Sequence, residues 1–432
     1  MRYKPMTPEF FKRNRKRLIE KLLPDSTVVL AGNETMPWSG DQDFTFRQNS
    51  NFFYLTGIDE ENAMLCLCPH HPDPSLREVL FVKHADPTMV IWYGKRLSQE
   101  EASDLSGIKT VKWTSDFQST LRDMVMQSRT IYMELNEYLK YSTPVADRNR
   151  RLIDELKSLY PLHQFERIAP QITELRLSKS TEELEYIAKS IDITRKAFLR
   201  VLKTTKPGMM EYEVEAEISY EFMRRGASGH AYSPIVASGE NACVLHYITN
   251  DSVLRDGELL LLDFGAVYGN YAADCSRTIP VNGKFTPRQK QCYNAVLDVF
   301  KQAKTLLVPG ASIEKTNKQI ALLLEQKMID LGLFTAADVK NQASGASPLY
   351  FRYYMHGASH FMGLDVHDVG LKTTILRKGM VLTCEPGLYI KEEGIGIRIE
   401  NDILVDDTPI DLMRHFPIEA DEIEKLMKES TL

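Results

Sequence analysis

The sequence predicts an α/β domain over residues 1–175, followed by an α+β domain over residues 176–432. Before about residue 170, short apolar runs of strand length alternate with helical stretches. After about residue 180, amphipathic helices come first and hairpin-like strands follow, an order typical of α+β domains. The length of 432 residues agrees with two or three domains of about 150 residues each.

The first domain contains apolar runs that have the length and composition of β-strands. They span residues 26–32, 51–57, 63–69, 78–84 and 129–135. Residues 1–23 predict an amphipathic helix. They do not predict a signal peptide, because they lack its uninterrupted apolar segment. Residues 143–161 predict a second helix, with one Pro near its start and another just past its end.

The second domain is expected to begin with helices. Ser180 and Glu183 form a capping box, which predicts the start of a helix that runs to about residue 205. A second helix is predicted over about residues 211–225. Thr286 and Gln289 form another capping box, and two more helices are expected after it. The strands are predicted at residues 230–240, 242–248, 257–269 and 270–281, and in a strand-rich end over about 353–405.

The composition excludes several classes of protein. Hydrophobic residues at 43% and charged residues at 26% are typical of a folded globular chain. With 53 Lys and Arg against 59 Asp and Glu, the net charge is −6, which argues against nucleic-acid and anionic-membrane binding. The sequence lacks a run of 18 apolar residues that would predict a transmembrane helix. Six cysteines without a CxxC pair predict reduced thiols in a cytoplasmic protein.

Two aspartates are predicted to share one face of a β-hairpin. Residues 269–270 (Gly-Asn) stand between two strand-like runs and predict a tight turn. The resulting register places Asp263 opposite Ser276, and Asp274 diagonal to Asp263 with Cβ atoms roughly 7–8 Å apart. The pair is either part of a metal site or two solvent-facing residues. Four leucines precede Asp263, which disfavours the solvent-facing interpretation.

Further carboxylates occur near the C-terminal strands. Arg398 and Glu400 share one face of a predicted strand, whereas Ile397 and Ile399 share the other. Glu385 ends a strand just before a Pro-Gly turn. From the pattern alone, Arg398 and Glu400 are either a structural ion pair or site residues. Glu385 is either a turn residue or a site residue.

Three histidines lie within twelve residues, at His356, His360 and His367. The spacing of the first two is that of a zinc-protease helix, but the required Glu is absent and Gly357 disfavours a helix. A lone histidine is more often a buried, hydrogen-bonded residue than a ligand, whereas this clustering favours a site. His246 is expected on a strand and adds a fourth histidine.

One histidine and four carboxylates could together hold two divalent metal ions. Ligation by many oxygens and one imidazole suits Mn²⁺, Co²⁺ or Zn²⁺, and the hard oxygens favour Mn²⁺. Two ions about 3.5–4 Å apart can share a hydroxide and stabilise a tetrahedral intermediate.

From about residue 175 to residue 405 the sequence resembles the pita-bread metallopeptidases. The segments that carry this resemblance are LLLDFGAVYGNYAADCSRT, HGASHFMGLDVHD, LTCEPGLY and GIRIEND. Within the family the sequence is most similar to the aminopeptidase P group, through SGENACVLHY and RTIPVNGKFT. The segments FRQNSNFFYLTG and IWYGKR resemble the N-terminal domain of that group, the creatinase/aminopeptidase P N-terminal type. The resemblance therefore covers nearly the whole chain.

The resemblance implies the roles of individual residues. The implied metal ligands are Asp263, Asp274, His360, Glu385 and Glu400. Glu385 would also act as general base, while His356 and His367 would bind the substrate carbonyl and stabilise the oxyanion. The implied substrate-binding residues are His246, Arg398, Trp92 and Tyr389. Trp92 is expected either to line the site of an adjacent subunit or to be a packed strand aromatic.

The implied activity is removal of the first residue from peptides with proline at the second position, by attack of a metal-bridging hydroxide. One alternative is an Xaa-Pro dipeptidase with the same ligands. A non-catalytic peptide-binding protein on the same fold is another, which five intact ligands disfavour. The resemblance also implies a homodimer or homotetramer, with the N-terminal domain serving oligomerisation and substrate access. Peptides are the expected partners, with neither nucleic acid nor membrane.

Overall fold

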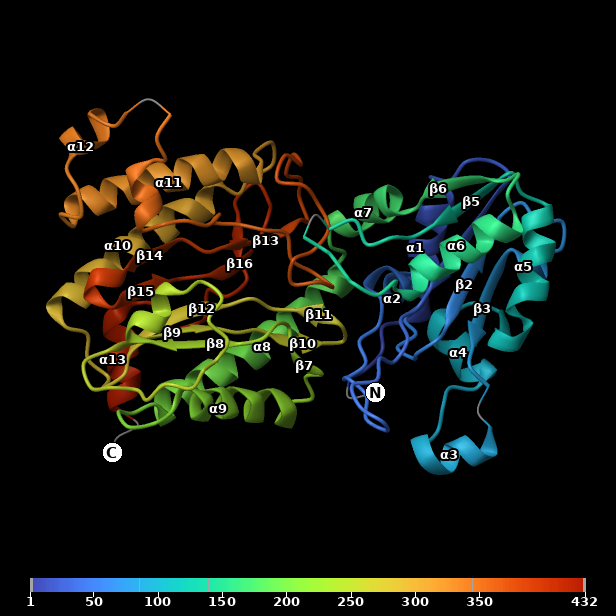
Figure 1. Cartoon of the computed structure of the whole chain (residues 1–432), viewed down its shortest axis with the longest axis horizontal. Coiled ribbons are helices and arrows are strands. Elements are labelled where there is room, and N and C mark those ends of the chain that lie inside the picture. Colours follow the sequence, from blue (N-terminus) through green and yellow to red (C-terminus); the bar gives the residue numbers. More distant parts are fainter. Residues whose placement is uncertain (1–2, 85, 139, 344, 430–432) are drawn as a thin grey trace. The chain divides into compact units, whose positions relative to one another are not determined.

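The structure, a computed structural model, describes residues 3–84, 86–138, 140–343 and 345–429. The chain divides into two units between Arg176 and Leu177. The N-terminal unit comprises residues 4–176, and the C-terminal unit comprises the rest of the described chain, including Tyr3. Figure 1 shows the elements of each unit. In the described ranges, the structure contains no helix that is both long enough and apolar enough to cross a membrane.

The N-terminal unit is built on a six-stranded mixed sheet with the strand order β4-β3-β2-β1-β5-β6. Its strands are β1 (Ser26–Ala31), β2 (Met64–Leu67), β3 (Glu78–Val82), β4 (Thr110–Trp113), β5 (Thr130–Met133) and β6 (Gln164–Arg167). The pairs β1–β2 and β2–β3 are antiparallel, whereas β3–β4, β1–β5 and β5–β6 are parallel.

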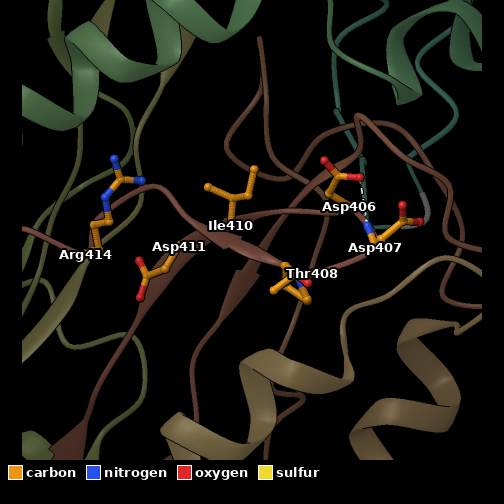
Figure 2. Close-up of a pocket in the computed structure, with 7 residues that line it drawn as sticks. Asp406, Asp407, Thr408, Ile410, Asp411 and Arg414 are labelled. Carbon is orange, nitrogen blue, oxygen red and sulfur yellow. Dashed lines mark hydrogen bonds between the residues drawn. The ribbon is translucent and has the colours of Figure 1, made fainter.

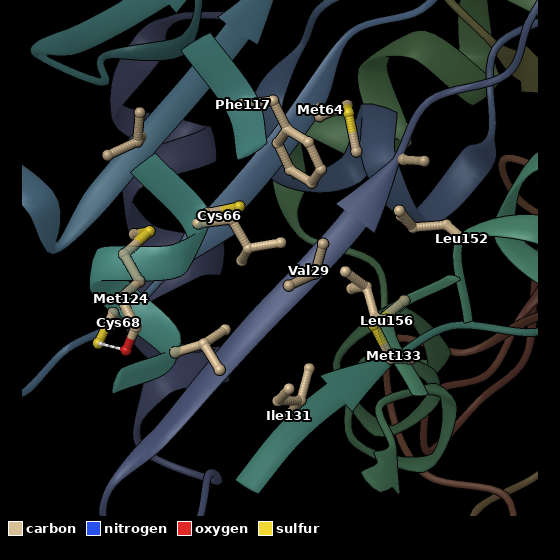
Figure 3. Packing of buried hydrophobic residues seen from close by; sticks show 14 of the residues in the cluster. Val29, Met64, Cys66, Cys68, Phe117, Met124, Ile131, Met133, Leu152 and Leu156 are labelled. Atoms are coloured by element: carbon tan, nitrogen blue, oxygen red, sulfur yellow. Dashed lines mark hydrogen bonds between the residues drawn. The ribbon is translucent and has the colours of Figure 1, made fainter. Parts of the chain in front are cut away.

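The N-terminal unit also contains helices. They are α1 (Pro8–Ile19), α2 (Ser50–Thr56), α3 (Pro87–Tyr93), α4 (Gln99–Ser106), α5 (Phe117–Met126), α6 (Arg148–Leu159) and α7 (Ala169–Leu177). Figure 3 shows Val29 of β1 and Ile131 of β5 in one buried cluster with Met124 of α5 and Leu156 of α6. Every residue of β1 is buried, so both faces of the central strand are covered. This architecture confirms the α/β prediction.

The predicted strand over residues 51–57 is wrong, because these residues form α2. The Asn49 side chain accepts a hydrogen bond from the Phe52 N–H at 2.8 Å and caps the start of the helix. Gly57 ends the helix with a φ of 69°, a left-handed conformation that favours glycine. The aromatic residues predict a strand here, but the Asn49 cap and the left-handed Gly57 define a helix instead.

The C-terminal unit is an α+β structure, as predicted. Its helices are α8 (Thr181–Thr204), α9 (Glu211–Arg224), α10 (Pro287–Ala303), α11 (Ile313–Asp330), α12 (Ala336–Lys340) and α13 (Ala420–Lys428). The predicted capping boxes begin α8 and α10. Figure 1 shows the strands of this unit between α8 and α9 on one side and α10 and α11 on the other.

The strands of the C-terminal unit pair antiparallel. They are β7 (Gly229–His230), β8 (Ile235–Ser238), β9 (Leu259–Asp263), β10 (Ala266–Tyr268), β11 (Tyr271–Ala272), β12 (Ser276–Pro280), β13 (Val381–Cys384), β14 (Gly387–Ile390), β15 (Ile395–Arg398), β16 (Asn401–Leu404) and β17 (Ile410–Asp411). Strands β9–β12 and β13–β16 form two long hairpins, each interrupted partway along its length.

The first hairpin has the predicted register. Ser276 is opposite Asp263, and residues 269–270 form the turn with φ values of 56° and 67°. At the interruption, the two strands approach so closely that a Cβ on Gly265 would lie 1.7 Å from the Ala273 carbonyl oxygen. Only glycine fits there, and this close approach brings the segment around Asp263 against the segment around Asp274.

Two other predicted strand regions are partly wrong. Residues 242–248 form the end of a 3₁₀ helix (Gly239–Cys243) and a following turn, so His246 does not lie on a strand. The Tyr247 hydroxyl of this segment and the Asn241 amide just before it donate to Glu211 instead of the backbone forming a strand ladder. The strand-rich end begins at Val381 instead of residue 353; between these positions the described residues make isolated bridges at Phe361, to Leu382, and at Met380, to Ser178.

Candidate metal centre

The four predicted carboxylate ligands stand at the interruptions of the two hairpins. Asp263 ends β9, and Asp274 lies between β11 and β12. In the second hairpin, residues 385–386 and 399–400 fill the gap between two paired stretches. Glu385 and Glu400 therefore occupy equivalent places on opposite strands. Each hairpin supplies two carboxylates from the point where its ladder breaks.

His360 is tied to the second hairpin by its backbone. Its N–H donates to the Thr383 hydroxyl at 3.0 Å, and its carbonyl accepts the Thr383 N–H at 2.9 Å. The ring Nδ1 lies 3.0 Å from the Phe361 carbonyl oxygen, which fixes the proton on Nδ1 and leaves Nε2 facing the acids. His360 Nε2 is 3.3 Å from Asp274 Oδ2 and 3.9 Å from Glu385 Oε1.

The tightest ligand group contains Asp274, His360 and Glu400. One ligand atom from each lies within 4.8 Å of the others, the spacing that a single cation could bridge. Glu400 also accepts a hydrogen bond from the Ser276 hydroxyl at 2.6 Å. Glu385 adjoins this group through His360, so the structure brings four of the five predicted ligands together.

Asp263 lies beside the same group. The Tyr232 hydroxyl oxygen is 2.5 Å from Asp263 Oδ1 and 2.5 Å from Asp274 Oδ1. The other oxygen of Asp263 accepts a hydrogen bond from Arg398 Nη2 at 2.6 Å. All five predicted ligands thus form one contiguous cluster, in which Arg398 and Tyr232 hold Asp263.

The electrostatics of the cluster fit a bound cation. Burial and neighbouring carboxylates raise the pKa of Asp274, raise that of Glu385 to about 7 and raise that of Glu400 well above its usual range. Burial lowers the pKa of His360, but its hydrogen bond to Asp274 and the nearby negative charges raise it to about 9. Buried acids that repel one another bind a divalent ion in place of protons. Oxygen donors with one imidazole suit Mn²⁺, Co²⁺ or Zn²⁺.

A hydrogen-bonded chain runs from Arg398 to His356. Arg398 Nη1 donates to the Tyr389 hydroxyl at 2.9 Å, and that hydroxyl is 2.8 Å from His356 Nε2. His356 Nδ1 is 2.8 Å from the Gly357 carbonyl oxygen, so Nδ1 carries the proton and Nε2 accepts from Tyr389. Burial and the charge of Arg398 lower the pKa of His356 to about 4, which keeps this ring neutral.

The remaining predicted residues differ in their surroundings. The His367 ring is exposed and its centroid lies 4.2 Å from that of His360. His246 is exposed on its turn, and its neighbours Leu245 and Tyr247 pack against a buried cluster that includes Tyr389, so the turn lies beside the same site. Trp92 is on α3 of the N-terminal unit and is 77% exposed, so its interpretation as a packed strand aromatic is wrong.

Sequence reasoning missed two residues of the cluster. Ser276 links the hairpins, because its hydroxyl donates to Glu400 and accepts from Arg398 Nε at 2.8 Å. The register that placed Ser276 opposite Asp263 could have identified it. Tyr232 follows β7 in a short irregular segment, and no sequence pattern distinguishes it from other exposed or packed tyrosines.

A pocket of about 550 Å³ lies elsewhere in the C-terminal unit, around β17 and the turn before it (Figure 2). None of its lining residues belongs to the predicted site. Its carboxylates already have partners: Asp411 binds Lys304, and Asp406 and Asp407 both bind Lys378. The chemistry therefore concentrates at the hairpin interruptions, not in this pocket.

Comparisons with known proteins agree with this placement. Residues 185–407 match the model of metallopeptidase family M24, and residues 11–132 match that of the aminopeptidase P N-terminal domain. The Xaa-Pro aminopeptidase of Escherichia coli K12 is 36% identical, over 96% of this chain and 97% of that protein. A solved structure of E. coli aminopeptidase P with the inhibitor Pro-Leu is 34% identical and superimposes with a TM-score of 0.88, covering 99% of this chain and 100% of the other. A zinc-substituted E. coli aminopeptidase P in complex with product gives a TM-score of 0.87 at 34% identity, with 99% of both chains covered.

Proposed function

The chain belongs to metallopeptidase family M24, and we propose from its site how it acts on peptides. It is a metal-dependent Xaa-Pro aminopeptidase, which releases the first residue of a peptide whose second residue is proline. The observation that carries this conclusion is the Asp274–His360–Glu400 group, with both acids buried and His360 partly exposed, set in a fold that matches aminopeptidase P over nearly its full length.

We assign the metal ligands to the five residues of the cluster: Asp263, Asp274, His360, Glu385 and Glu400. Their contiguity and the raised pKa values of the buried acids support this assignment. Bound divalent ions supply a nucleophile at neutral pH, because they lower the pKa of water toward about 7. The ligand set favours Mn²⁺ over Co²⁺ and Zn²⁺, since four of the five donors are hard oxygens.

The chain's own residues move the proton and orient the substrate. Glu385 accepts a proton from the attacking water, whose oxygen bonds to the carbonyl carbon of the first residue. The carbon–nitrogen bond then breaks, and the proton held on Glu385 passes to the proline nitrogen. We assign contact with the substrate carbonyl to His367, whose ring is exposed beside His360.

Arg398, Tyr389 and His356 form a hydrogen-bonded chain beside the metal ligands. Arg398 holds Asp263 and, through the Tyr389 hydroxyl, orients the neutral ring of His356. Both nitrogens of His356 have partners within the protein, so its ring is fixed before substrate binds. We place His246 against the residue that follows the cleaved bond, because it is exposed and its neighbours Leu245 and Tyr247 pack against the cluster that contains Tyr389.

The surroundings of the enzyme are also proposals. We infer that it works in the cytoplasm, which six cysteines without a disulfide support. We propose a homodimer or homotetramer in which the N-terminal unit contacts a second copy. The exposed Trp92 on α3 supports a place for that residue at a neighbouring subunit's site.

Hydrolysis of Gly-Pro-Leu, compared with that of Gly-Pro, tests the activity. We expect release of glycine from the tripeptide in the presence of Mn²⁺, abolished by a chelator and restored by added metal. Cleavage of the dipeptide alone would identify a dipeptidase. Hydrolysis of neither peptide by the metal-loaded protein would contradict the proline specificity.

A further inference from the structure

Glu211, the first residue of α9, is fully buried and accepts hydrogen bonds from a single loop. We call residues 238–252 the recognition loop; it leaves the end of β8. The donors to Glu211 Oε1 are the Ser238 N–H at 2.7 Å, the Ser238 hydroxyl at 2.8 Å and the Asn241 amide at 3.1 Å. Those to Oε2 are the Tyr247 hydroxyl at 2.8 Å and the Ser252 N–H at 3.0 Å.

This carboxylate has no cationic partner among the ion pairs of the described ranges. Burying a carboxylate is costly unless hydrogen bonds replace its water. All the donors that replace it come from the start, middle and end of the recognition loop. The buried Glu211 carboxylate therefore keeps its hydrogen bonds only when that loop adopts this one conformation.

The recognition loop presents alternate residues to opposite sides. Cys243, Leu245 and Tyr247 pack against a buried cluster that includes Tyr389. The residues between and after them face outward, with Val244 and Ile248 56% and 58% exposed. His246 stands in the middle of this outward set. The Tyr247 hydroxyl, bonded to Glu211, thus fixes the residue directly after His246.

The next turn of α9 adds a second attachment. Glu215 accepts a hydrogen bond from the Asn250 amide at 2.8 Å, and Asn250 has a φ of 49°, in the left-handed region. The Asn250 side-chain oxygen accepts the Val236 N–H of β8 at 3.0 Å. Asn250 is therefore held without Glu211, whereas Asn241, Tyr247 and Ser252 are held by it.

We propose that Glu211 is a positioning residue for substrate recognition, which fixes the recognition loop so that His246 contacts the residue after the cleaved bond. The inference rests on the proposed function, because it takes His246 to be a substrate-binding residue. Glu211 acts through the loop, because the donors to its carboxylate are Ser238, Asn241, Tyr247 and Ser252.

The test uses Glu211→Gln, which keeps the volume but replaces one accepting oxygen with an amide that faces hydrogen-bond donors. Loss of one hydrogen bond to a charged group corresponds to about a tenfold rise in KM for Gly-Pro-Leu. We expect kcat and the bound metal to stay near the wild-type values. Glu213→Gln is the matched control, since Glu213 is exposed two residues along the same helix; it should leave KM unchanged.

A double-mutant cycle with His246→Ala separates positioning from general destabilisation. If Glu211 acts through His246, then Glu211→Gln adds little to the KM of His246→Ala. Multiplied losses in the double variant would overturn the inference, as would a fall in kcat with KM unchanged. Tyr247→Phe removes one donor without loss of volume, and it carries the same test if thermal unfolding shows that Glu211→Gln is not folded.

The wild-type protein distinguishes failure of the inference from failure of the activity. If it cleaves Gly-Pro-Leu and Glu211→Gln behaves like Glu213→Gln, the positioning role is wrong and the proposed function stands. If the metal-loaded wild-type protein does not cleave the tripeptide, the proposed function is wrong and the inference is overturned with it.

Discussion

Lys179 Nζ lies 3.0 Å from Asp368 Oδ2, and the two side chains are only 1% and 2% exposed. Lys179 stands just after the boundary between the units, and Asp368 directly follows His367. The Asp368 N–H also donates to the Phe361 carbonyl at 2.8 Å, which closes the histidine-bearing loop. The buried ion pair thus joins the start of the C-terminal unit to the segment that carries His360 and His367.

We predict that Lys179→Met destabilises the C-terminal unit by about 3–5 kcal/mol, because it breaks a buried ion pair by removing the ammonium group 3.0 Å from Asp368 Oδ2. Urea unfolding followed by circular dichroism measures the change. Lys318→Met is the control, since its partner Glu314 and its own side chain are exposed, and it should have little effect. Equal destabilisation by both variants would contradict the claim that the buried Lys179–Asp368 pair contributes more to stability than an exposed pair.

The stability of the N-terminal unit is expected to depend on pH through Glu61. Burial raises the pKa of Glu61, but hydrogen bonds from Thr35, Arg96 and Lys83 outweigh it and lower the pKa to about 2. The ionised form therefore stabilises the folded state fully above the ordinary pKa of 4.5, and this contribution is lost as pH falls toward about 2. Glu61→Gln should cost about 1 kcal/mol at neutral pH after allowance for solvent screening.

Tryptophan fluorescence measures this effect selectively. All three tryptophans, Trp38, Trp92 and Trp113, lie in the N-terminal unit. Urea unfolding of the wild type and Glu61→Gln should differ at pH 7 and converge as the pH is lowered from 4.5 toward 2. A difference that stays constant over this range would show that the charge of Glu61 is not responsible.

Asp274→Asn should abolish metal binding and reduce activity by about 100-fold or more, because a neutral amide replaces a ligand in the tightest part of the cluster. Elemental analysis after dialysis gives the metal content, and Gly-Pro-Leu hydrolysis gives the activity. Asp330→Asn, an exposed change at the end of α11, should alter neither. Full metal content in Asp274→Asn would disprove the ligand assignment.

Tyr232→Phe should weaken metal affinity by about 10–100-fold without unfolding the protein. The single hydroxyl proton of Tyr232 serves two carboxylates, Asp263 and Asp274, and the variant leaves both without it. Competition with a metal-binding dye measures the affinity. Tyr212→Phe, at an exposed position of α9, is the control, and an equal affinity in the two variants would contradict the role of Tyr232.

Local signals predicted the parts of the fold that depend on neighbouring residues. The capping boxes at Ser180 and Thr286 and the hairpin turn at residues 269–270 each involve contacts over a few residues, and the structure confirms them. The register that followed from the turn placed Asp263 opposite Ser276 correctly. Antiparallel pairing propagates local information along a hairpin, which is why these positions could be predicted.

Residues that depend on distant partners could not be predicted in this way. The segment around His246 has the composition of a strand, but Glu211, which precedes His246 by 35 residues, holds it as a loop through hydrogen bonds from Asn241 and Tyr247. Tyr232 belongs to the cluster only because the fold brings its hydroxyl to two aspartates. Neither relationship has a spacing that a single sequence reveals.

The interrupted hairpins also determine where the chain can tolerate insertions and deletions. The acids lie at the interruptions of the hairpins, whereas the turns at residues 269–270 and 391–394 close the far ends of the paired strands. Extra residues grafted into either turn would leave the pairing intact and keep each carboxylate in place. Deletion of a single residue within β13 would instead shift the register by one residue between the deletion and Glu385. The side chains there would then point to the opposite face, and the Glu385 carboxylate would turn away from its partners. The lengths of these two turns can therefore change without loss of the site, whereas the length of β13 cannot.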